Sequence, residues 1–470
     1  MATAQSVGAP AQRPSADARL NRTLAVVIIG SVMSVLDMTI VNVALRSLSE
    51  SFHAPLETIQ WTTTAYTLAL AAVIPTAAWA MGRFGTRRAY LTALALFTLG
   101  SLLTACAWNT GTLIAFRAVQ GLGGGLLMPV GMAMTMAVAD RERYGRTMAL
   151  LGLPVLIGPV AGPVLGGWLL DATSWRWIFL VNLPVGVLAL TLAAKLLLPD
   201  APRKGVPAPK LDVPGLLALS PGLALLLFGL ARGGERGDFT APGALLPTLA
   251  GTVLIAAFVW RALTTRHPLL DIRLLTDRTF AVGIGVLALF TCGYFGSMLL
   301  GPVYWQEVRG WSATSTGLLG VPVGLAVGTT MQWAARRVDK VPPRRLIRAG
   351  IVIGALGMAL TGLSIGTHDV PAWQPLSSTV LMGIGSGLVL MPTMTTASRD
   401  LPKDRLAAAS TALGINSQVC ASVGTALISV VLGSAGTDPS GFRIAYLIAA
   451  GLLALALVPA MALPGRRPGA

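Results

Sequence analysis

The sequence predicts an all-α membrane protein that crosses the bilayer as fourteen helices. Hydrophobic residues make up 54% of the chain and charged residues only 11%, whereas soluble domains carry about 25% charged residues. The apolar residues fall in runs of about twenty, which is long enough to cross ~30 Å of hydrocarbon as a helix. The runs do not alternate apolar and polar residues, as the strands of a membrane barrel would. Helices therefore remain as the way to satisfy every backbone polar group within lipid.

The predicted spans follow one another along nearly the whole chain. A short charged stretch, residues 140–146, joins the fourth span to the fifth, and only a short polar stretch, residues 233–238, separates the seventh from the eighth. The expected spans are residues 24–45, 58–81, 90–107, 112–139, 147–170, 177–198, 211–231, 241–263, 280–304, 315–335, 346–366, 376–397, 406–432 and 444–463.

The distribution of the 35 Lys and Arg residues favours an even number of spans. With a cytoplasmic N-terminus, most basic residues face the cytoplasm, as the positive-inside rule requires. Dropping one helix would move the strongest basic cluster, residues 336–348, to the outer side. We therefore expect a multi-pass protein of the bacterial cytoplasmic membrane with both termini in the cytoplasm. The basic residues assigned to outer loops are Arg46, Arg176, Arg232, Arg236, Arg309 and Arg443.

Composition also limits the possible functions. The net charge of +16 is spread over short loops on one side of the membrane, which argues against nucleic-acid binding. Cys106, Cys292 and Cys420 lie inside predicted spans, so neither a disulfide framework nor a metal or cofactor site is expected. Residues 1–22 and 466–470 are predicted to be cytoplasmic tails, the first of them disordered and without the apolar segment of a signal peptide.

An internal repeat organises the chain. The segment RAVQGLGGGLLMP, residues 117–129, is echoed by TVLMGIGSGLVLMP, residues 379–392, and the loop GRFGTRRAYL at residues 82–91 by DKVPPRRLI at residues 339–347. The glycines themselves are explained by close packing of membrane helices. Parallel repeats of six helices are typical of one transporter fold. The predicted parts are an N-terminal six-helix bundle at residues 23–200, a linker with two inserted helices at 201–265 and a C-terminal six-helix bundle at 266–465, the bundles being related by a pseudo-twofold repeat.

The two copies differ in their buried polar residues. Arg117 corresponds to Thr379 and Gln120 to Met382, and Asp37 is the one acid well inside a predicted span. A carboxylate there costs about 2.5–3.5 kcal/mol on insertion scales, so a functional role is the default interpretation. If access to the carboxylate alternates between the two sides, a proton can be bound on one side and released on the other. We therefore predict that Asp37 and Arg117 couple transport to protons. The alternative is a structural ion pair that only locks two helices.

Five segments resemble, in the family's order, the signatures of the fourteen-helix drug:proton antiporter branch of the major facilitator superfamily. The resemblance covers residues 24–463 and implies a proton-linked role for Asp37 and Arg117. The segments are LDMTIVNVAL (36–45), QWTTTAY (60–66), RAVQGLGGG (117–125), GLPVLIGPVAGPVLGG (152–167) and SWRWIFLVNLPVG (174–186). The fourth of them resembles the antiporter motif, with Gly158, Pro159, Gly162, Gly166 and Gly167.

The first cytoplasmic loop departs from the family pattern. The family usually has an aspartate where this chain has Gly82, whereas the copy of this loop in the second half carries Asp339. The expected inner gate consists of Arg83, Arg87, Asp339 and Arg344, and we expect it to depend more on Asp339 than on the first loop.

The resemblance and the buried charges together predict a monomeric antiporter, without a cofactor, that exports small, largely apolar drugs or antibiotics in exchange for protons. Two alternatives remain open: a proton-coupled importer of the same fold, and a polytopic membrane enzyme, for which the sequence shows no clustered catalytic set. Polar side chains that offer hydrogen bonds without charge are candidates for the substrate cavity, although such residues also bond between helices. These candidates are Gln60, Tyr66, Gln120, Asn416 and Gln418.

Overall fold

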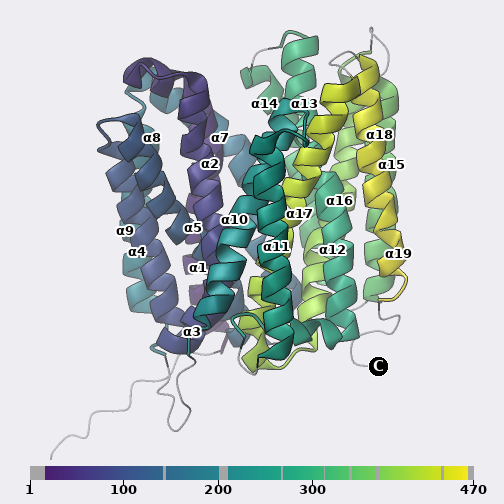
Figure 1. Cartoon of the computed structure of the whole chain (residues 1–470). Coiled ribbons are helices and arrows are strands. Elements are labelled where there is room, and N and C mark those ends of the chain that lie inside the picture. Colours follow the sequence, from purple (N-terminus) through teal and green to yellow (C-terminus); the bar gives the residue numbers. More distant parts are fainter. Residues whose placement is uncertain are drawn as a thin grey trace, which may run out of the picture.

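The computed structural model describes residues 16–140, 144–200, 210–265, 268–311, 313–337, 341–365, 370–435 and 439–463. These residues form helices joined by short turns and loops, and none of them forms a β-strand. The long helices stand side by side along one common direction (Figure 1). Twelve helices within the described residues are long and apolar enough to cross a membrane. The predicted all-α membrane fold is confirmed. The count of fourteen stays a prediction, because α7 and α14, at the fifth and tenth predicted positions, are not among those twelve.

Each predicted span coincides with a helix or with a helix broken near a proline. The second span, for example, is interrupted at Ile74–Thr76, where Pro75 lacks the N–H that an unbroken helix needs. The helices of the first half are α1 (Ala16–Phe52), α2 (Leu56–Val73), α3 (Ala77–Phe84), α4 (Thr86–Ala105), α5 (Thr110–Val138), α6 (Tyr144–Leu151), α7 (Leu153–Ala172), α8 (Arg176–Leu180) and α9 (Asn182–Leu196). Then follow α10 (Val213–Arg236), α11 (Pro242–Thr264), α12 (Arg278–Ser297), α13 (Leu300–Val303), α14 (Ala313–Arg337), α15 (Pro343–Ile365), α16 (Trp373–Arg399), α17 (Leu406–Ala435), α18 (Pro439–Leu455) and α19 (Leu457–Ala460).

The helices pack as two groups with an inserted pair between them. Helix α5 packs against α1, α2 and α4, whereas α16 packs against α12, α14 and α15. Helix α10 contacts both α2 and α17, and α11 packs mainly on α10, so the inserted pair covers one seam between the halves (Figure 1).

Among the described residues, the buried cluster that draws on both halves lies at one end of the molecule. One buried cluster combines Leu24 and Met134 of the first half with Leu406 and Leu413 of the second. These residues lie near the end where α1 begins, α5 ends and α17 begins. The cluster around Phe179 draws only on the first half and the cluster around Phe442 only on the second. The structure is therefore closed at the end where α1 begins.

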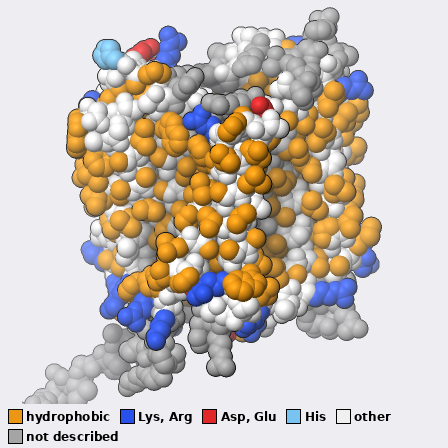
Figure 2. Space-filling view, viewed as in Figure 1, with side chains coloured by type: hydrophobic (Ala, Val, Ile, Leu, Met, Phe, Trp, Pro, Cys, Tyr) orange, Lys and Arg blue, Asp and Glu red, His pale blue; other side chains and the backbone are white. Residues whose placement is uncertain are grey.

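The outer surface is that of a multi-pass membrane protein. Hydrophobic side chains cover the middle of the visible face, and Lys and Arg side chains gather near its lower end (Figure 2). Large aromatic side chains are exposed near helix ends, including Trp108, which is 69% exposed, and Trp260, which is 71% exposed. Tryptophan at such positions is typical of the boundary between lipid and water.

Candidate functional site

The centre of the first half holds a buried ion pair between Asp37 of α1 and Arg117 of α5. The Arg117 Nη1 atom lies 2.6 Å from Asp37 Oδ2, and both side chains have no exposed surface. Burial of a charge is costly unless an opposite charge and hydrogen bonds compensate it. The structure thus brings together the two residues that the sequence singled out, although they are 80 positions apart.

Two amides complete the surroundings of the Asp37 carboxylate. Its Oδ1 atom accepts hydrogen bonds from Gln120 Nε2 at 2.8 Å and from Asn182 Nδ2 at 2.9 Å. Gln120 also accepts a hydrogen bond from Arg117 Nη1 at 2.9 Å, so it bridges the two charged groups. Helices α1, α5 and α9 therefore meet at one carboxylate, and both of its oxygens have a donor.

Arg117 is held from the side of α2 as well. Its Nε atom donates to the carbonyl oxygen of Thr62 at 3.3 Å. The guanidinium carbon lies 4.2 Å from the centre of the Tyr66 ring, a distance at which a cation is attracted to an aromatic face. The Nη2 atom is buried and has no hydrogen-bond partner within the described residues. One donor of the guanidinium is thus left for a different pairing if the ion pair opens.

Asn182 is a site residue that sequence reasoning missed. Its amide donates to Asp37 and also to Ser101 Oγ at 3.0 Å, and Ser101 donates to the carbonyl oxygen of Phe179 at 2.9 Å. The segment SWRWIFLVNLPVG already indicated Asn182, because its side chain is the one amide within an apolar run. Such a residue is expensive within the membrane unless it has a partner.

Helix α7, which carries the segment that resembles the antiporter motif, packs directly on α1 beside the ion pair. Thr39, two positions after Asp37, donates from Oγ1 to the carbonyl oxygen of Gly158 at 2.9 Å. A methyl group added at Gly162 would collide with the Thr39 hydroxyl. Movement of α7 would therefore act on the stretch of α1 that carries the acid. Of the other motif residues, a methyl group added at Gly166 would meet Ile40, whereas one added at Gly167 would enter open space, and the Pro159 side chain lies outside the described residues.

The five cavity candidates do not come together as one group. Tyr66 and Gln120 are fully buried in the network around the ion pair. Gln60 is exposed near the beginning of α2, and Asn416 and Gln418 are half-buried on α17. The Asn416 Nδ2 atom is buried without a hydrogen-bond partner in the described part of the chain. Asn416 thus has a hydrogen-bond donor to offer to a ligand.

An acid that sequence reasoning overlooked organises the loop between α3 and α4. Asp200, which follows α9, accepts hydrogen bonds from the main-chain N–H groups of Arg87 at 3.0 Å and Arg88 at 3.3 Å, at the beginning of α4. Gly85 has a positive φ of 93°, and a side chain there would collide with the Asp200 carboxylate. The loop that lacks an aspartate at Gly82 is therefore tied by an aspartate from the end of the bundle.

The other residues of the expected gate are less fully described. Arg83 is exposed in the last turn of α3. Arg344 is half-buried at the beginning of α15, with a buried Nε atom that has no partner among the described residues. Asp339 lies outside the described residues, so the predicted role of this acid stays a prediction.

Comparison with known proteins decides the family. The model of the Major Facilitator Superfamily matches residues 27–425. This chain belongs to the Major Facilitator Superfamily. It is 43% identical over 419 residues to "Multidrug resistance protein B homolog" of Mycobacterium tuberculosis, a match that covers 88% of this chain and 77% of that protein. It is 33% identical over 449 residues to "Putative multidrug resistance protein MdtD" of Serratia proteamaculans, with 93% and 91% covered.

Solved structures of this superfamily share the fold. The proton:xylose symporter XylE aligns with a TM-score of 0.66 at 18% identity, over 94% of this chain and 95% of XylE. The human organic anion transporter MFSD10 aligns with a TM-score of 0.65 at 14% identity, over 95% of this chain and 100% of that one. At these identities the likeness shows the fold and no substrate. Membership of a transporter family, with the buried site between helices, points to a transporter rather than an enzyme.

Proposed function

We propose that this protein is a proton-coupled antiporter that exports small, largely apolar drugs or antibiotics across the bacterial cytoplasmic membrane by alternating access. The observation that carries the proposal is the Asp37–Arg117 ion pair, fully buried and bonded to Gln120 and Asn182. The names of the relatives, which are multidrug resistance proteins, support drug export.

Proton binding at Asp37 is the step that couples the movement of protons to the movement of the drug. A protonated carboxyl group is neutral, so it no longer compensates the Arg117 charge, and the guanidinium would turn toward Thr62, Gln120 and the Tyr66 ring. Because α7 packs on α1 next to the acid, this change would be felt at the contact between α1 and α7. Rocking of the two bundles would then expose the site to the other side.

The remaining parts of the proposal concern the gate and topology. Both termini face the cytoplasm, so the closed end of the structure is the cytoplasmic end, where the basic loops gather. Arg83, Arg87, Asp339 and Arg344 form the inner gate, and the chain acts as a monomer.

The charges also limit the substrates. One buried acid can compensate one positive charge, and unpaired ions in a low-dielectric site are costly. Neutral or singly charged compounds are therefore the expected substrates, with Asn416, Gln418 and Gln60 as hydrogen-bonding groups.

The decisive experiment uses everted membrane vesicles whose lumen has been acidified. An exported drug added outside such vesicles should enter the lumen while protons leave, which a pH-sensitive dye reports as a loss of the gradient. Vesicles without the protein supply the baseline. No proton movement on addition of any drug that the protein transports would contradict antiport.

The runner-up is a proton-coupled importer of the same fold, since the neighbouring XylE is a proton symporter. The same vesicles distinguish it. A symporter moves protons and solute in one direction, so in de-energised vesicles an outward solute gradient would alkalinise the lumen instead of acidifying it.

A further inference from the structure

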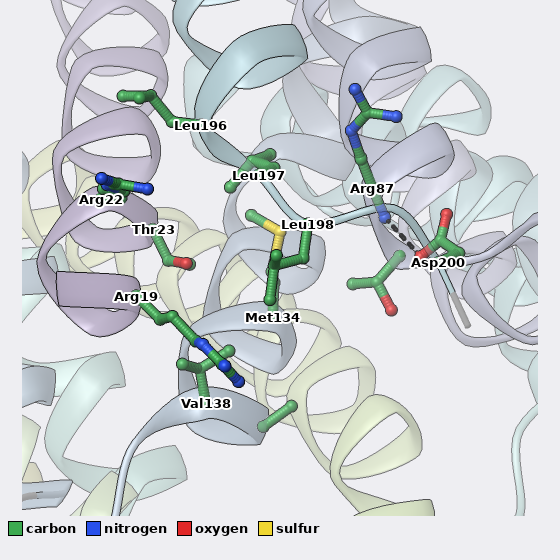
Figure 3. Close-up of a pocket in the computed structure, with 12 residues that line it drawn as sticks. Arg19, Arg22, Thr23, Arg87, Met134, Val138, Leu196, Leu197, Leu198 and Asp200 are labelled. Atoms are coloured by element: carbon green, nitrogen blue, oxygen red, sulfur yellow. Dashed lines mark hydrogen bonds between the residues drawn. The ribbon is translucent and has the colours of Figure 1, made fainter. Parts of the chain in front are cut away.

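The cytoplasmic end of the first half contains a pocket apart from the ion pair. It encloses about 160 Å³ between the beginnings of α1 and α4 and the ends of α5 and α9. Figure 3 shows Arg19 and Arg22 on one side, Arg87 and Asp200 on the other, and Met134 between them. The pocket thus combines positive charge at its rim with an apolar centre.

The lining of the pocket carries three arginines, Arg19, Arg22 and Arg87, and one acid. Asp200 is the one acid among the lining residues, and its two oxygens accept the main-chain N–H groups of Arg87 and Arg88. Arg22 is exposed and forms no hydrogen bond or ion pair with another described residue. Arg87 donates from Nη2 to the Ala194 carbonyl oxygen at 2.5 Å, and its Nε atom is buried without a partner in the part of the chain that the structure describes.

Exposed leucines lie beside the pocket and on the neighbouring helix α9. Leu198, two residues beyond the end of α9, lines the pocket and is 51% exposed, and Leu188 on α9 is exposed as well. From Leu188 to Leu196, the last residue of α9, the helix rises roughly 12 Å, which is nearly half of the ~30 Å thickness of the hydrocarbon core. This is the length over which one acyl chain lies in a single leaflet.

We propose that this pocket binds the phosphate headgroup of an anionic phospholipid from the cytoplasmic leaflet, with an acyl chain along α9. Arginine forms paired hydrogen bonds with phosphate oxygens, and basic pockets between membrane helices at the cytoplasmic side suit such headgroups. A cationic drug would be repelled from the same place. The proposal does not depend on proton coupling, because lipid binding is measured without transport.

The test measures which lipid the purified full chain retains. The protein is exchanged into mixed micelles with equal amounts of phosphatidylglycerol and phosphatidylcholine, and bound lipid is counted by native mass spectrometry. Wild type should retain phosphatidylglycerol preferentially. Arg22→Gln should lower that preference about fivefold and Arg19→Gln/Arg22→Gln about thirtyfold, at roughly 1 kcal/mol for each arginine near the surface.

The matched control is Arg278→Gln, an exposed arginine at the beginning of α12 in the second half, which should leave the preference unchanged. Arg22→Lys keeps the positive charge but cannot form two parallel hydrogen bonds to one phosphate group, so it should keep only part of the preference. Equal retention of the two lipids by wild type, or an unchanged preference in the double variant, would overturn the proposal.

A free phosphate compound is the other source of the same chemistry. Glycerol phosphate is therefore added at millimolar concentration to the micelles. Retention of phosphatidylglycerol in its presence supports a lipid site, whereas saturable binding of glycerol phosphate without any lipid preference would assign the pocket to a soluble ligand and overturn the lipid assignment.

Discussion

Helices α5 and α16 occupy equivalent positions in the two halves, yet only α5 carries buried charge. Gly123 of α5 packs against the backbone of α4 at Phe97, and Gly385 of α16 packs against the backbone of α15 at Gly354. The equivalents of Arg117 and Gln120 are Thr379 and Met382, and Thr379 donates to the Pro375 carbonyl oxygen within its own helix at 2.7 Å. The repeat therefore preserves the packing and not the polar network, which separates structural residues from candidate coupling residues.

Loss of the acid should have the largest effect. Asp37→Asn keeps the size of the side chain and one of its two acceptor oxygens but cannot exchange a proton, so proton-driven export in everted vesicles should be abolished while the protein remains folded. Asp171→Asn, an exposed acid at the end of α7, is the control. Export at the wild-type rate by the Asp37 variant would mean that the proton binds elsewhere.

The second comparison is between the equivalent positions of the two halves. Arg117→Ala leaves a buried carboxylate without its partner, a change that costs about 3–5 kcal/mol in proteins, and should nearly eliminate transport. Thr379→Ala removes one uncharged hydroxyl, which bonds to Pro375 in its own helix and lies 3.4 Å from the Thr361 hydroxyl, and should have little effect. The readout is drug efflux per amount of folded protein. If the alanine variant does not accumulate in the membrane, Arg117→Lys, which keeps the charge, is measured in its place. Equally mild losses of efflux at positions 117 and 379 would mean that Arg117 is a packing residue.

The glycines should behave alike in the two halves. Gly123→Ala and Gly385→Ala each place a methyl group against a neighbouring backbone, and overpacking of this kind costs about 1–3 kcal/mol. Both should lower the thermal unfolding temperature in detergent by similar amounts. Gly451→Ala on α18, with open space around it, should not lower it. A loss of stability in only one half would show that the packing is not equivalent.

Sequence reasoning was most successful where the signal is local. Apolar runs of about twenty residues predicted the positions of the helices, although α1 extends from Ala16 to Phe52, beyond the predicted 24–45, because helical backbone continues past the hydrocarbon core. Asn182 and Asp200 were missed because their partners lie 145 and about 113 positions away in the chain. Hydropathy and spacing contain no information on which distant helix a polar side chain meets.

The smallest expected effect concerns Asn182, and it tests how far the network around the acid extends. Asn182→Ala removes one of the two donors to Asp37 Oδ1 and leaves the Arg117 pair in place. Loss of a hydrogen bond to a charged group costs about 1.5–3 kcal/mol, so transport should fall by roughly one order of magnitude and not to zero.

Ser101→Ala is the matched control, because Ser101 bonds to the Asn182 amide at 3.0 Å and not to the carboxylate itself. Its effect on export should be clearly smaller than that of Asn182→Ala, while both variants lose a similar amount of thermal stability. The measurements are proton-driven efflux in everted vesicles and unfolding temperature in detergent, taken on the same preparations. If the two variants reduced efflux equally, Asn182 would only join α9 to α4 through Ser101, and the site that handles the proton would be confined to α1 and α5.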